Sequence, residues 1–168
     1  MEANSEDKKF GTHIVQYPAD YSLCAGCGTC EAVCGLTHDG VTSPLIKRIF
    51  LVRDTTMTED MHKVFSCQQC LNHPCYDACP KKDEAMLIDC KTGVVYIDPD
   101  NCIGCGSCVD ACPFEPKRIS IHPEKPQKAL KCDLCRTRPE GPACVEYCQV
   151  RCIGLSDASG AVKEEQHG

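Results

Sequence analysis

The residues of this chain best suited to chemistry are its cysteines, of which there are 18 among 168 residues. Thiol groups in such number act as disulfide partners or as ligands for soft metal ions. Sixteen of them fall into four runs, and each run closes with the spacing C-x3-C. The runs are Cys24, Cys27, Cys30 and Cys34; Cys67, Cys70, Cys75 and Cys79; Cys102, Cys105, Cys108 and Cys112; and Cys132, Cys135, Cys144 and Cys148.

The cysteine spacing of the third run guides the interpretation of the other three runs. Its spacing is C-x2-C-x2-C-x3-C followed by Pro113. In this pattern three thiolates hold one [4Fe-4S] cluster and the fourth ligates a second cluster. The first run has the same spacing with Gly35 in place of proline, the second has C-x4-C before Pro80, and the fourth has an eight-residue loop in its middle. One such run predicts a partner run, and the sequence supplies three.

The closing C-x3-C predicts a short helical turn that places two thiolates on one face, from which they reach different clusters. A proline after the last cysteine cannot continue the helix and turns the chain away. The second and third runs can therefore exchange their fourth cysteines within a compact module over residues 64–115, and the first and fourth runs pair around it. Glycines between the cysteines, such as Gly26 and Gly104, let backbone N–H groups approach the sulfur atoms.

Zinc and disulfides are the other uses of such cysteines. Structural zinc takes four thiolates, typically as two C-x2-C pairs, and has no use for a repeated trailing C-x3-C. The N-terminal residues 1–9 are charged, without an apolar segment or twin arginine, so we expect no export signal and a cytoplasmic location. Disulfides are rare in that compartment. Iron–sulfur clusters are therefore the preferred reading.

Two cysteines and one histidine stand apart from the counted sets. Cys90 and Cys152 lie outside the four runs, and we expect both to be small packing residues. The alternative is a spare ligand or a redox-sensitive thiol. His73 lies inside the second run, but the complete cysteine set there makes it an improbable ligand.

Composition and charge exclude several classes of partner and function. The chain has no Trp, four Phe and five Tyr, so side-chain burial alone is a weak basis for the core and the clusters must help to stabilise it. The formal charge of −6 becomes about −14 with sixteen thiolates and four oxidised cluster cores of about +2 each. This charge argues against a nucleic-acid partner. The sequence lacks the roughly 18 uncharged apolar residues of a membrane span, so we expect no direct membrane insertion.

Short strands are expected between the runs. Residues 11–23 have strand character, and residues 45–53 alternate well enough for a strand. We expect Lys47, Arg48 and Arg53 on that strand to form a solvated face, with a docking strip for a partner as the alternative.

A hairpin is expected over residues 86–98, with Gly93 in its turn, where it would cover a cluster pair. Residues 116–126 are rich in proline and predict a connector, with a short strand at residues 118–122.

Taken together, these motifs resemble a known family. Four runs in this order, with C-x4-C in the second and a long insertion in the fourth, are similar to the four-cluster ferredoxin-type electron-transfer subunits of dimethyl sulfoxide reductase-like molybdenum enzymes. Similar small subunits accompany tungsten aldehyde oxidoreductases and tungsten-dependent benzoyl-CoA reductases. The resemblance covers residues 11–155 and departs from the common pattern at Gly35 and Gln149, where proline often follows the last cysteine.

The resemblance implies an α+β fold of tandem bacterial-ferredoxin-like modules, with small β-hairpins and short helices around four [4Fe-4S] clusters. We expect an outer discontinuous module over residues 11–63 and 116–155, and an inner module over residues 64–115. A disordered N-terminus at residues 1–10 and a flexible tail at residues 156–168 complete the expected organisation.

The resemblance also implies which cysteines share a cluster. The four implied ligand sets are Cys67, Cys70, Cys75 with Cys112; Cys102, Cys105, Cys108 with Cys79; Cys24, Cys27, Cys30 with Cys148; and Cys132, Cys135, Cys144 with Cys34.

A chain that can hold four one-electron centres, without a hydrolytic or nucleotide-binding motif, is suited to conduct electrons and not to catalyse a reaction. We therefore expect a non-catalytic electron-transfer subunit that relays electrons between a large catalytic subunit and an external donor or acceptor, such as a flavin or ferredoxin partner.

A tungsten aldehyde oxidoreductase is the favoured type of catalytic partner. The alternatives are a subunit of a molybdopterin reductase or formate dehydrogenase, and a free-standing polyferredoxin. Clusters at opposite ends of the chain also permit head-to-tail self-association, a contact that need not close into a ring.

Overall fold

The computed structural model describes residues 11–18, 22–53 and 62–156. Within this part of the chain, four helices alternate with eight strands, which form four separate two-stranded antiparallel sheets. In chain order the elements are β1 (Ile14–Gln16), α1 (Thr29–Asp39), β2 (Ile49–Arg53), β3 (His62–Ser66), α2 (Pro74–Asp77), β4 (Met86–Ile88), β5 (Val95–Ile97), α3 (Ser107–Asp110), β6 (Ile119–Ile121), β7 (Ala129–Lys131), α4 (Ala143–Glu146) and β8 (Ile153–Leu155). The expected α+β fold of short helices and hairpins is confirmed.

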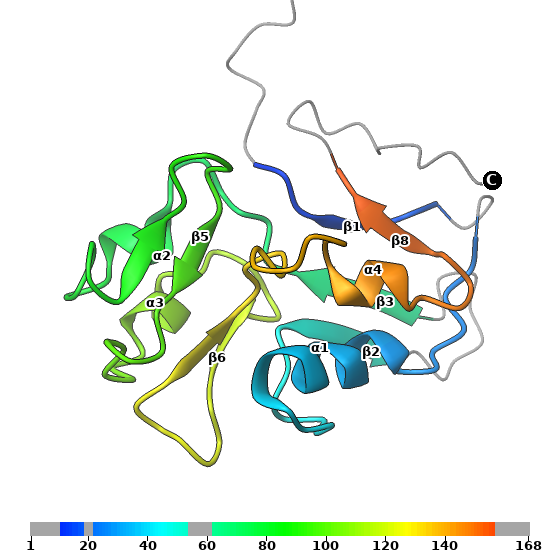
Figure 1. The fold of residues 1–168 in the computed structure, drawn as a ribbon, viewed down its shortest axis with the longest axis horizontal. Coiled ribbons are helices and arrows are strands. Elements are labelled where there is room, and N and C mark those ends of the chain that lie inside the picture. The colour runs from blue at the N-terminus through cyan, green and yellow to red at the C-terminus, as the bar shows by residue number, and fades with distance from the viewer. Residues whose placement is uncertain (1–10, 19–21, 54–61, 157–168) are drawn as a thin grey trace, which may run out of the picture.

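These elements gather into two halves (Figure 1). In one half α2 packs against α3, and the pairs β4–β5 and β6–β7 lie beside them. In the other half α1 packs against α4, next to the pairs β2–β3 and β1–β8. Each half therefore combines two helices from different cysteine runs with two small sheets.

Two of the sheets are local hairpins. The hairpin expected over residues 86–98 is confirmed, since Met86 pairs with Ile97 and Ile88 with Val95. Its turn closes where the N–H of Gly93, at φ 71°, donates to the carbonyl of Asp89 at 2.8 Å. The strand expected at residues 118–122 is also present as β6, and it pairs with β7 across the proline-rich connector.

The other two sheets join more distant segments. β1 is shorter than the strand character of residues 11–23 indicated, and it pairs with β8 in the register Ile14 to Leu155. β2 occupies the second half of the strand expected at residues 45–53 and pairs with β3, a strand that was not predicted. The β1–β8 pair thus brings the segments on either side of the first and fourth cysteine runs together.

Each helix carries the third cysteine of a run. Cys30, Cys75, Cys108 and Cys144 lie in α1, α2, α3 and α4 respectively. Three helices are one turn long, whereas α1 continues through Cys34 to Asp39. The helical turn expected at each C-x3-C is therefore present at the third cysteine of every run.

The core is built from sulfur and a few apolar side chains. Ile49, Met86 and Leu130 are the largest fully buried apolar residues in the described part of the chain. Around them lie buried cysteines from all four runs, and none of the 18 cysteines forms a disulfide. The scarcity of aromatic residues is thus matched by a core in which cysteines fill much of the interior.

Two expectations about individual residues are wrong. Ser156, expected to begin the flexible tail, is buried, and its N–H donates to the carbonyl of His13 at 2.9 Å. Lys47 and Arg48 do not form a solvated face, because Lys47 pairs with Glu31 and Arg48 donates to Asp39 at 2.5 Å, both on α1. These ion pairs hold the segment immediately before β2 against α1.

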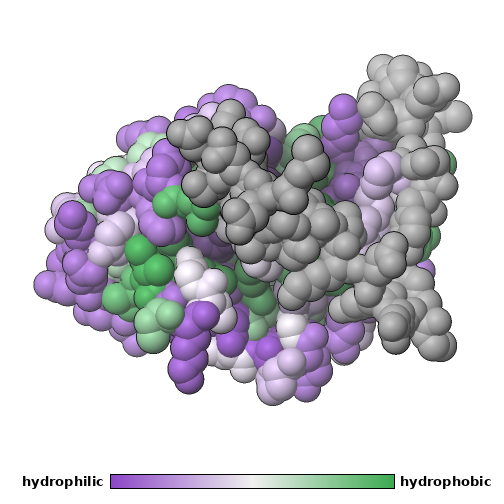
Figure 2. Space-filling view, turned by 90° about the horizontal axis from the view of Figure 1, so that it is seen from above, coloured by the Kyte–Doolittle hydropathy of each residue, from purple (hydrophilic) through white to green (hydrophobic). Residues whose placement is uncertain are grey.

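The expected disorder of residues 1–10 and the rest of the expected tail, residues 157–168, lie outside the described residues. Among those that are described, no helix has the length and apolar character needed to cross a membrane. Figure 2 shows a largely hydrophilic face on which hydrophobic residues gather in small areas.

Candidate functional site

The structure brings the sixteen cysteines of the four runs together in four groups. We name each group by one member. The Cys67 site contains Cys67, Cys70, Cys75 and Cys112; the Cys102 site contains Cys79, Cys102, Cys105 and Cys108; the Cys24 site contains Cys24, Cys27, Cys30 and Cys148; and the Cys132 site contains Cys34, Cys132, Cys135 and Cys144. In every group three cysteines come from one run and the fourth from another.

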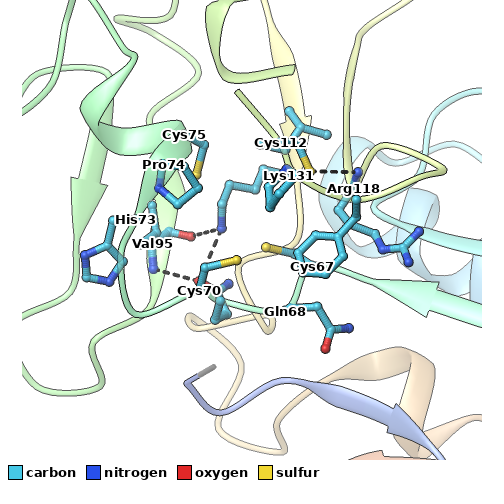
Figure 3. A pocket seen from close by; sticks show the side chains of 14 residues that line it. Cys67, Gln68, Cys70, His73, Pro74, Cys75, Val95, Cys112, Arg118 and Lys131 are labelled. Carbon is cyan, nitrogen blue, oxygen red and sulfur yellow. Dashed lines mark hydrogen bonds between the residues drawn. The ribbon is translucent and has the colours of Figure 1, made fainter. Parts of the chain in front are cut away.

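The Cys67 site is a cavity of about 350 Å³, part of which is open to solvent. Its cysteines face one another from both sides of the cavity, and Lys131 points in among them (Figure 3). The backbone N–H of Arg118 donates to the Sγ of Cys112 at 3.4 Å. Such N–H···S contacts stabilise negative charge on sulfur and tune the potential of a bound cluster.

The Cys102 and Cys24 sites resemble each other. They are hollows of about 350 and 300 Å³, which include space open to solvent, and in each the second cysteine of the run, Cys105 or Cys27, is exposed. Hydrogen bonds link Cys27 to the hydroxyl of Thr29 and Cys105 to that of Ser107. These hydroxyl contacts lower the pKa of both thiols. Both sites therefore present one sulfur at the protein surface.

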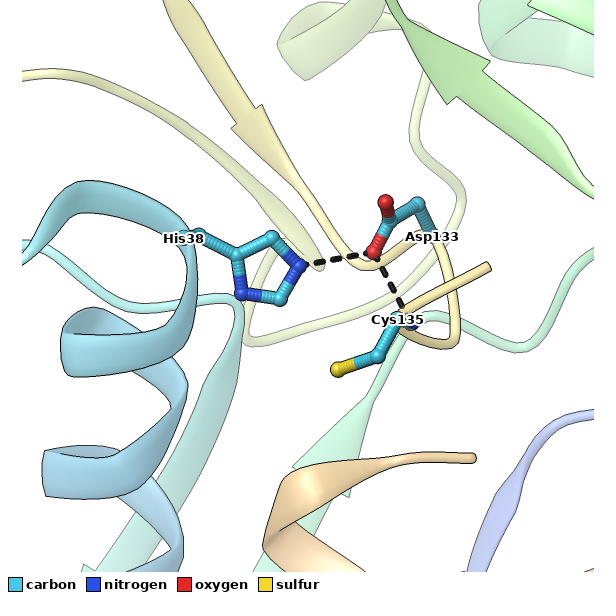
Figure 4. Close-up of side chains that lie close together, drawn as sticks. All are labelled: His38, Asp133 and Cys135. Carbon is cyan, nitrogen blue, oxygen red and sulfur yellow. Dashed lines mark hydrogen bonds and ion pairs between the residues drawn. The ribbon is translucent and has the colours of Figure 1, made fainter. Parts of the chain in front are cut away.

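The Cys132 site is the most enclosed, and all four of its cysteines are buried. Burial, with the neighbouring Cys132 and Cys34, raises the pKa of the Cys144 thiol well above its usual value. Figure 4 shows His38 on α1 facing Asp133, whose Oδ1 also accepts the backbone N–H of Cys135 at 3.0 Å. The His38 imidazole and its carboxylate partner thus border this site.

A repeated backbone feature shapes the four sites. The residue immediately before the second cysteine of each run has a left-handed backbone conformation, and these residues are Gly26, Gln69, Gly104 and Leu134, with φ of 66°, 47°, 67° and 57°. At Gly104 a Cβ atom would lie 1.8 Å from the carbonyl oxygen of Pro126, so this position has no room for a side chain. Left-handed backbone in a residue other than glycine costs about 1–2 kcal/mol, so Gln69 and Leu134 need compensation.

The side chain of Gln69 supplies such compensation. Its Nε2 donates to the carbonyl of Cys132 at 2.9 Å, and its Oε1 accepts the N–H of Val95 at 3.0 Å. Gln69 therefore joins the loop of the Cys67 site to the first residue of the fourth run. Sequence reasoning missed this residue, because a polar side chain between two cysteines looks like part of an exposed loop.

Lys131 is a second residue that sequence reasoning missed. It is only 3% exposed, and its Nζ donates to Gln69 Oε1 at 3.2 Å, to the Val95 carbonyl at 2.5 Å and to the Cys132 carbonyl at 3.3 Å. Three acceptors match the three protons of an ammonium group, which has no lone pair to accept a bond. Burial lowers the pKa of Lys131, but the nearby sulfurs of Cys67 and Cys75 outweigh it, so the net shift is upward.

Three residues that do not belong to the four cysteine groups differ in where they lie. They are Cys90, Cys152 and His73. Cys90 is exposed in the β4–β5 turn, so the expectation that it packs in the interior is wrong. Cys152 is buried and lines the cavity of the Cys24 site. His73 lines the cavity of the Cys67 site and precedes α2 with a φ of 42°.

The donor sets suit an iron–sulfur cluster. Burial raises the pKa of Cys30 and of Cys108 to about 12, so thiolates at these positions need a nearby positive charge. Iron supplies that charge, because metal binding deprotonates a coordinating thiol. Four sulfur donors that converge in a mainly apolar enclosure are the ligand set of a [4Fe-4S] cluster.

Comparison with protein families gives two matches. Residues 61–158 match a family described as a 4Fe-4S dicluster domain, and residues 21–37 match a 4Fe-4S binding domain. The first match includes the whole of the second, third and fourth runs, and the second match includes the whole of the first run.

Several curated proteins are similar over most of this chain. YsaA of Escherichia coli is 36% identical over 146 residues, which cover 83% of this chain and 87% of YsaA. The aliphatic sulfonate oxidoreductase, polyferredoxin-like subunit of Pyrococcus furiosus is 38% identical over 125 residues, which cover 74% of this chain and 66% of that subunit. The electron transport protein HydN of Escherichia coli is 29% identical over 154 residues, covering 80% of this chain and 83% of HydN.

Proposed function

Since this chain belongs to the 4Fe-4S dicluster family of electron-transfer subunits, we propose that it relays single electrons through four [4Fe-4S] clusters between a catalytic subunit and an external donor or acceptor. The observation that carries the proposal is the gathering of sixteen cysteines into four groups of four. In this proposal the Cys67, Cys102, Cys24 and Cys132 sites each hold one cluster, with all four named cysteines of a site as its ligands.

The order of the clusters follows from the segments that the sites share. α1 contains Cys30 of the Cys24 site and Cys34 of the Cys132 site. Gln69, which lies between Cys67 and Cys70, donates to the carbonyl of Cys132 at 2.9 Å, and Cys67 and Cys132 belong to one buried cluster, so the Cys132 and Cys67 sites are neighbours. The spacing between Cys75 and Cys79 joins the Cys67 site to the Cys102 site. The proposed relay therefore runs from the Cys24 site through the Cys132 and Cys67 sites to the Cys102 site.

The ends of this relay are also the sites with exposed sulfur. Cys27 and Cys105 are exposed at the two terminal sites, whereas every cysteine of the Cys132 site is buried. Exposed terminal centres are suited to exchange electrons with partners, and the buried Cys132 site is suited to pass them on without contact with solvent. The domain organisation that goes with this relay is an inner module over residues 64–115 and an outer module over residues 11–63 and 116–155.

The bound clusters supply the one-electron chemistry, and the chain sets their surroundings. Backbone N–H groups donate to sulfur, as from Arg48 to Cys34 at 3.3 Å and from Arg118 to Cys112 at 3.4 Å. These two contacts occupy equivalent places, each at the last cysteine of a run. Together with burial they adjust how readily each centre is reduced.

The family implies a catalytic partner, and its metal is a finer part of the proposal. We favour a tungsten aldehyde oxidoreductase type of partner, with a molybdopterin reductase or formate dehydrogenase type as the second candidate. The Pyrococcus relative is named as a subunit of an oxidoreductase, which supports a role within a complex. A flavin or ferredoxin protein would serve as the external redox partner, and head-to-tail self-association would place terminal sites of two copies together.

The test is an elemental and spectroscopic analysis of the complex purified anaerobically from its native source. We expect about sixteen iron atoms per copy of this chain beyond those of any partner, together with tungsten. Molybdenum would transfer the assignment to the second candidate. Iron without either metal and without a large copurifying subunit would indicate a free carrier, and zinc in place of iron would overturn the proposal.

A pair of variants tests the ligand assignment. Cys105→Ala removes a proposed ligand of the Cys102 site and should remove about four iron atoms, because cluster binding and folding are coupled. Cys90→Ala removes an exposed cysteine that lies outside all four sites and should leave the iron content unchanged. Full iron and full electron transfer in Cys105→Ala would contradict the assignment.

A further inference from the structure

The cavity of the Cys24 site contains more thiols than the cavities of the Cys67 and Cys102 sites. Its cavity is lined by Cys152 in addition to its four named cysteines. Cys152 is 2% exposed, and its Sγ lies 3.7 Å from the Sγ of Cys148. A fifth sulfur therefore lies beside a proposed ligand, inside the same enclosure.

A cluster of this kind takes four protein thiolates, so one of five thiols remains in excess. Two sulfur atoms that lie 3.7 Å apart approach the same part of the cavity, and hence the same iron atom. Cys24 also lies near Cys152 and raises its pKa, but Cys148 does so more strongly, and its sulfur is the one at 3.7 Å. The geometry makes Cys148 and Cys152 alternatives at one corner of the cluster, not simultaneous ligands at two.

The backbone fixes Cys152 at this position independently of its thiol. A turn after Cys148 closes where the N–H of Arg151, at φ 49°, donates to the Cys148 carbonyl at 3.1 Å. The carbonyl of Cys152 in turn accepts the N–H of Tyr17 at 2.8 Å, beside the β1–β8 pair. Because two main-chain contacts hold the residue on either side, its side chain stays at the cavity whether or not it binds iron.

The equivalent positions of the other runs carry no thiol. Four residues after the last cysteine of the first, second and third runs stand His38, Asp83 and Pro116. Cys152 occupies this position after the fourth run. A residue that only fills space would not need to be a cysteine, and the difference falls on a terminal site whose Cys27 is exposed.

We propose that Cys152 is a reserve iron ligand of the Cys24 site, which binds the iron atom of Cys148 when the Cys148 thiolate is lost. This inference rests on the proposed function, because it requires a cluster at that site. In the exchange the bond between iron and the Cys148 sulfur breaks, the bond between iron and the Cys152 sulfur forms, and the proton of the Cys152 thiol passes to solvent or to Cys148. No electron is gained or lost.

In the intact protein Cys152 remains a thiol next to Cys148. The exchange would keep the cluster in place if the half-buried Cys148 is oxidised or alkylated. The Cys102 site, at the other exposed end, has four thiols and no fifth. It therefore serves as an internal control.

The test compares iron and acid-labile sulfide in full-length variants purified anaerobically with their partner. We expect Cys148→Ala and Cys152→Ala each to retain the wild-type content, and the double variant to lose about four iron atoms. Cys79→Ala, which removes the equivalent fourth ligand of the Cys102 site, should lose about four on its own. Loss of iron from Cys148→Ala equal to that of the double variant would overturn the inference.

The variant Cys148→Ser provides a second test, which does not require the site to tolerate an alanine at this position. With Cys152 present, the low-temperature EPR signal of its Cys24 site should match the wild type, because all four ligands remain thiolates. Adding Cys152→Ala should change or abolish that signal. A changed signal in Cys148→Ser alone would count against a reserve ligand. A wild-type protein with fewer than about sixteen iron atoms would instead contradict the proposed function.

Discussion

The Nε2 of His38 lies 2.8 Å from Oδ1 of Asp133, and this contact joins α1 to the loop that begins the fourth run. The same imidazole contacts the carbonyl of Cys34 through its Nδ1 at 2.9 Å. In the sequence, Asp133 directly follows Cys132 and lies before Cys135. One ion pair therefore braces the backbone at three cysteines of the Cys132 site, on α1 and in the loop that begins the fourth run.

Removal of this brace should destabilise the protein. A hydrogen bond to a charged group contributes roughly 1.5–3 kcal/mol, so His38→Ala should lower the free energy of unfolding by about that amount. The measurement is the guanidinium concentration at which the visible absorbance of the clusters disappears under anaerobic conditions. Lys81→Ala is the control, because its pair with Glu84 is exposed and such pairs contribute about 0–1 kcal/mol. Equal midpoints for the two variants would show that the His38 contact is not a brace.

The same pair predicts how stability depends on pH. Burial lowers the pKa of His38, but its hydrogen bonds to Asp133, Cys135 and Cys34 together outweigh burial and raise the pKa from 6.5 to about 12. The folded state thus holds the proton more tightly than the unfolded state. The resulting stabilisation is fully present below pH 6.5 and declines as the pH rises toward about 12.

We therefore expect the difference in unfolding midpoint between the wild type and His38→Asn to shrink from about pH 6.5 to pH 9.5. The pKa of Asp133 is lowered from 3.8, chiefly because the charged His38 outweighs its burial, so this carboxylate stays ionised throughout that interval. A difference that stays constant over the interval would show that His38 does not carry the raised pKa.

Local spacing explains which features the sequence could predict. The cysteine runs, the helical turns at C-x3-C and the hairpin of β4 and β5 depend on residues close together in the chain, and all are present. The pairing of Ile14 with Leu155 could not be predicted in the same way, because nothing near either strand indicates its partner. That the grouped cysteines hold iron stays a prediction.

Polar side chains that are buried in the folded protein are the second feature that could not be predicted from the sequence. Lys47 and Arg48 follow an alternating pattern that is typical of an exposed strand, yet acidic residues of α1 draw both against the helix. Lys131 likewise looks like a surface lysine in the sequence, but three carbonyl acceptors compensate its burial. Partners that make such burial favourable come from elsewhere in the chain, so they are visible only in the folded structure.

Lys131 should raise the potential of the cluster proposed for the Cys67 site. A buried ammonium beside a cluster favours the reduced, more negative state, and little solvent screens it. Lys131→Met, which keeps much of the apolar stem, should lower that potential by on the order of 60 mV, a tenfold change in the ratio of reduced to oxidised centres. An EPR-monitored redox titration measures the shift.

The control for this prediction is Lys125→Met. Lys125 is exposed in the loop between β6 and β7, where solvent screens its charge. The two substitutions make the same change in net charge and differ in burial. If both variants shift the potential equally, the position of Lys131 is not what sets it.

Two glycines of the third run allow the effect of backbone conformation to be distinguished from the effect of available space. Gly104 and Gly106 both have left-handed backbone, with φ of 67° and 83°. A Cβ at Gly104 would lie 1.8 Å from the Pro126 oxygen, whereas one at Gly106 would meet nothing within 4 Å. The two positions therefore share the strain of an alanine and differ in the clash.

Gly106→Ala should cost about 1–2 kcal/mol from the left-handed backbone alone. Gly104→Ala adds a clash with the backbone of Pro126, which must move away from the Cys102 site, and should also reduce the iron held there. Iron content and the unfolding midpoint of both variants, measured side by side, check the prediction. Equal losses would mean that the segment around Pro126 yields freely and that its contact with Gly104 does not shape the site. A larger loss in Gly104→Ala alone would mean that the close approach of two backbones holds this end of the proposed relay in place.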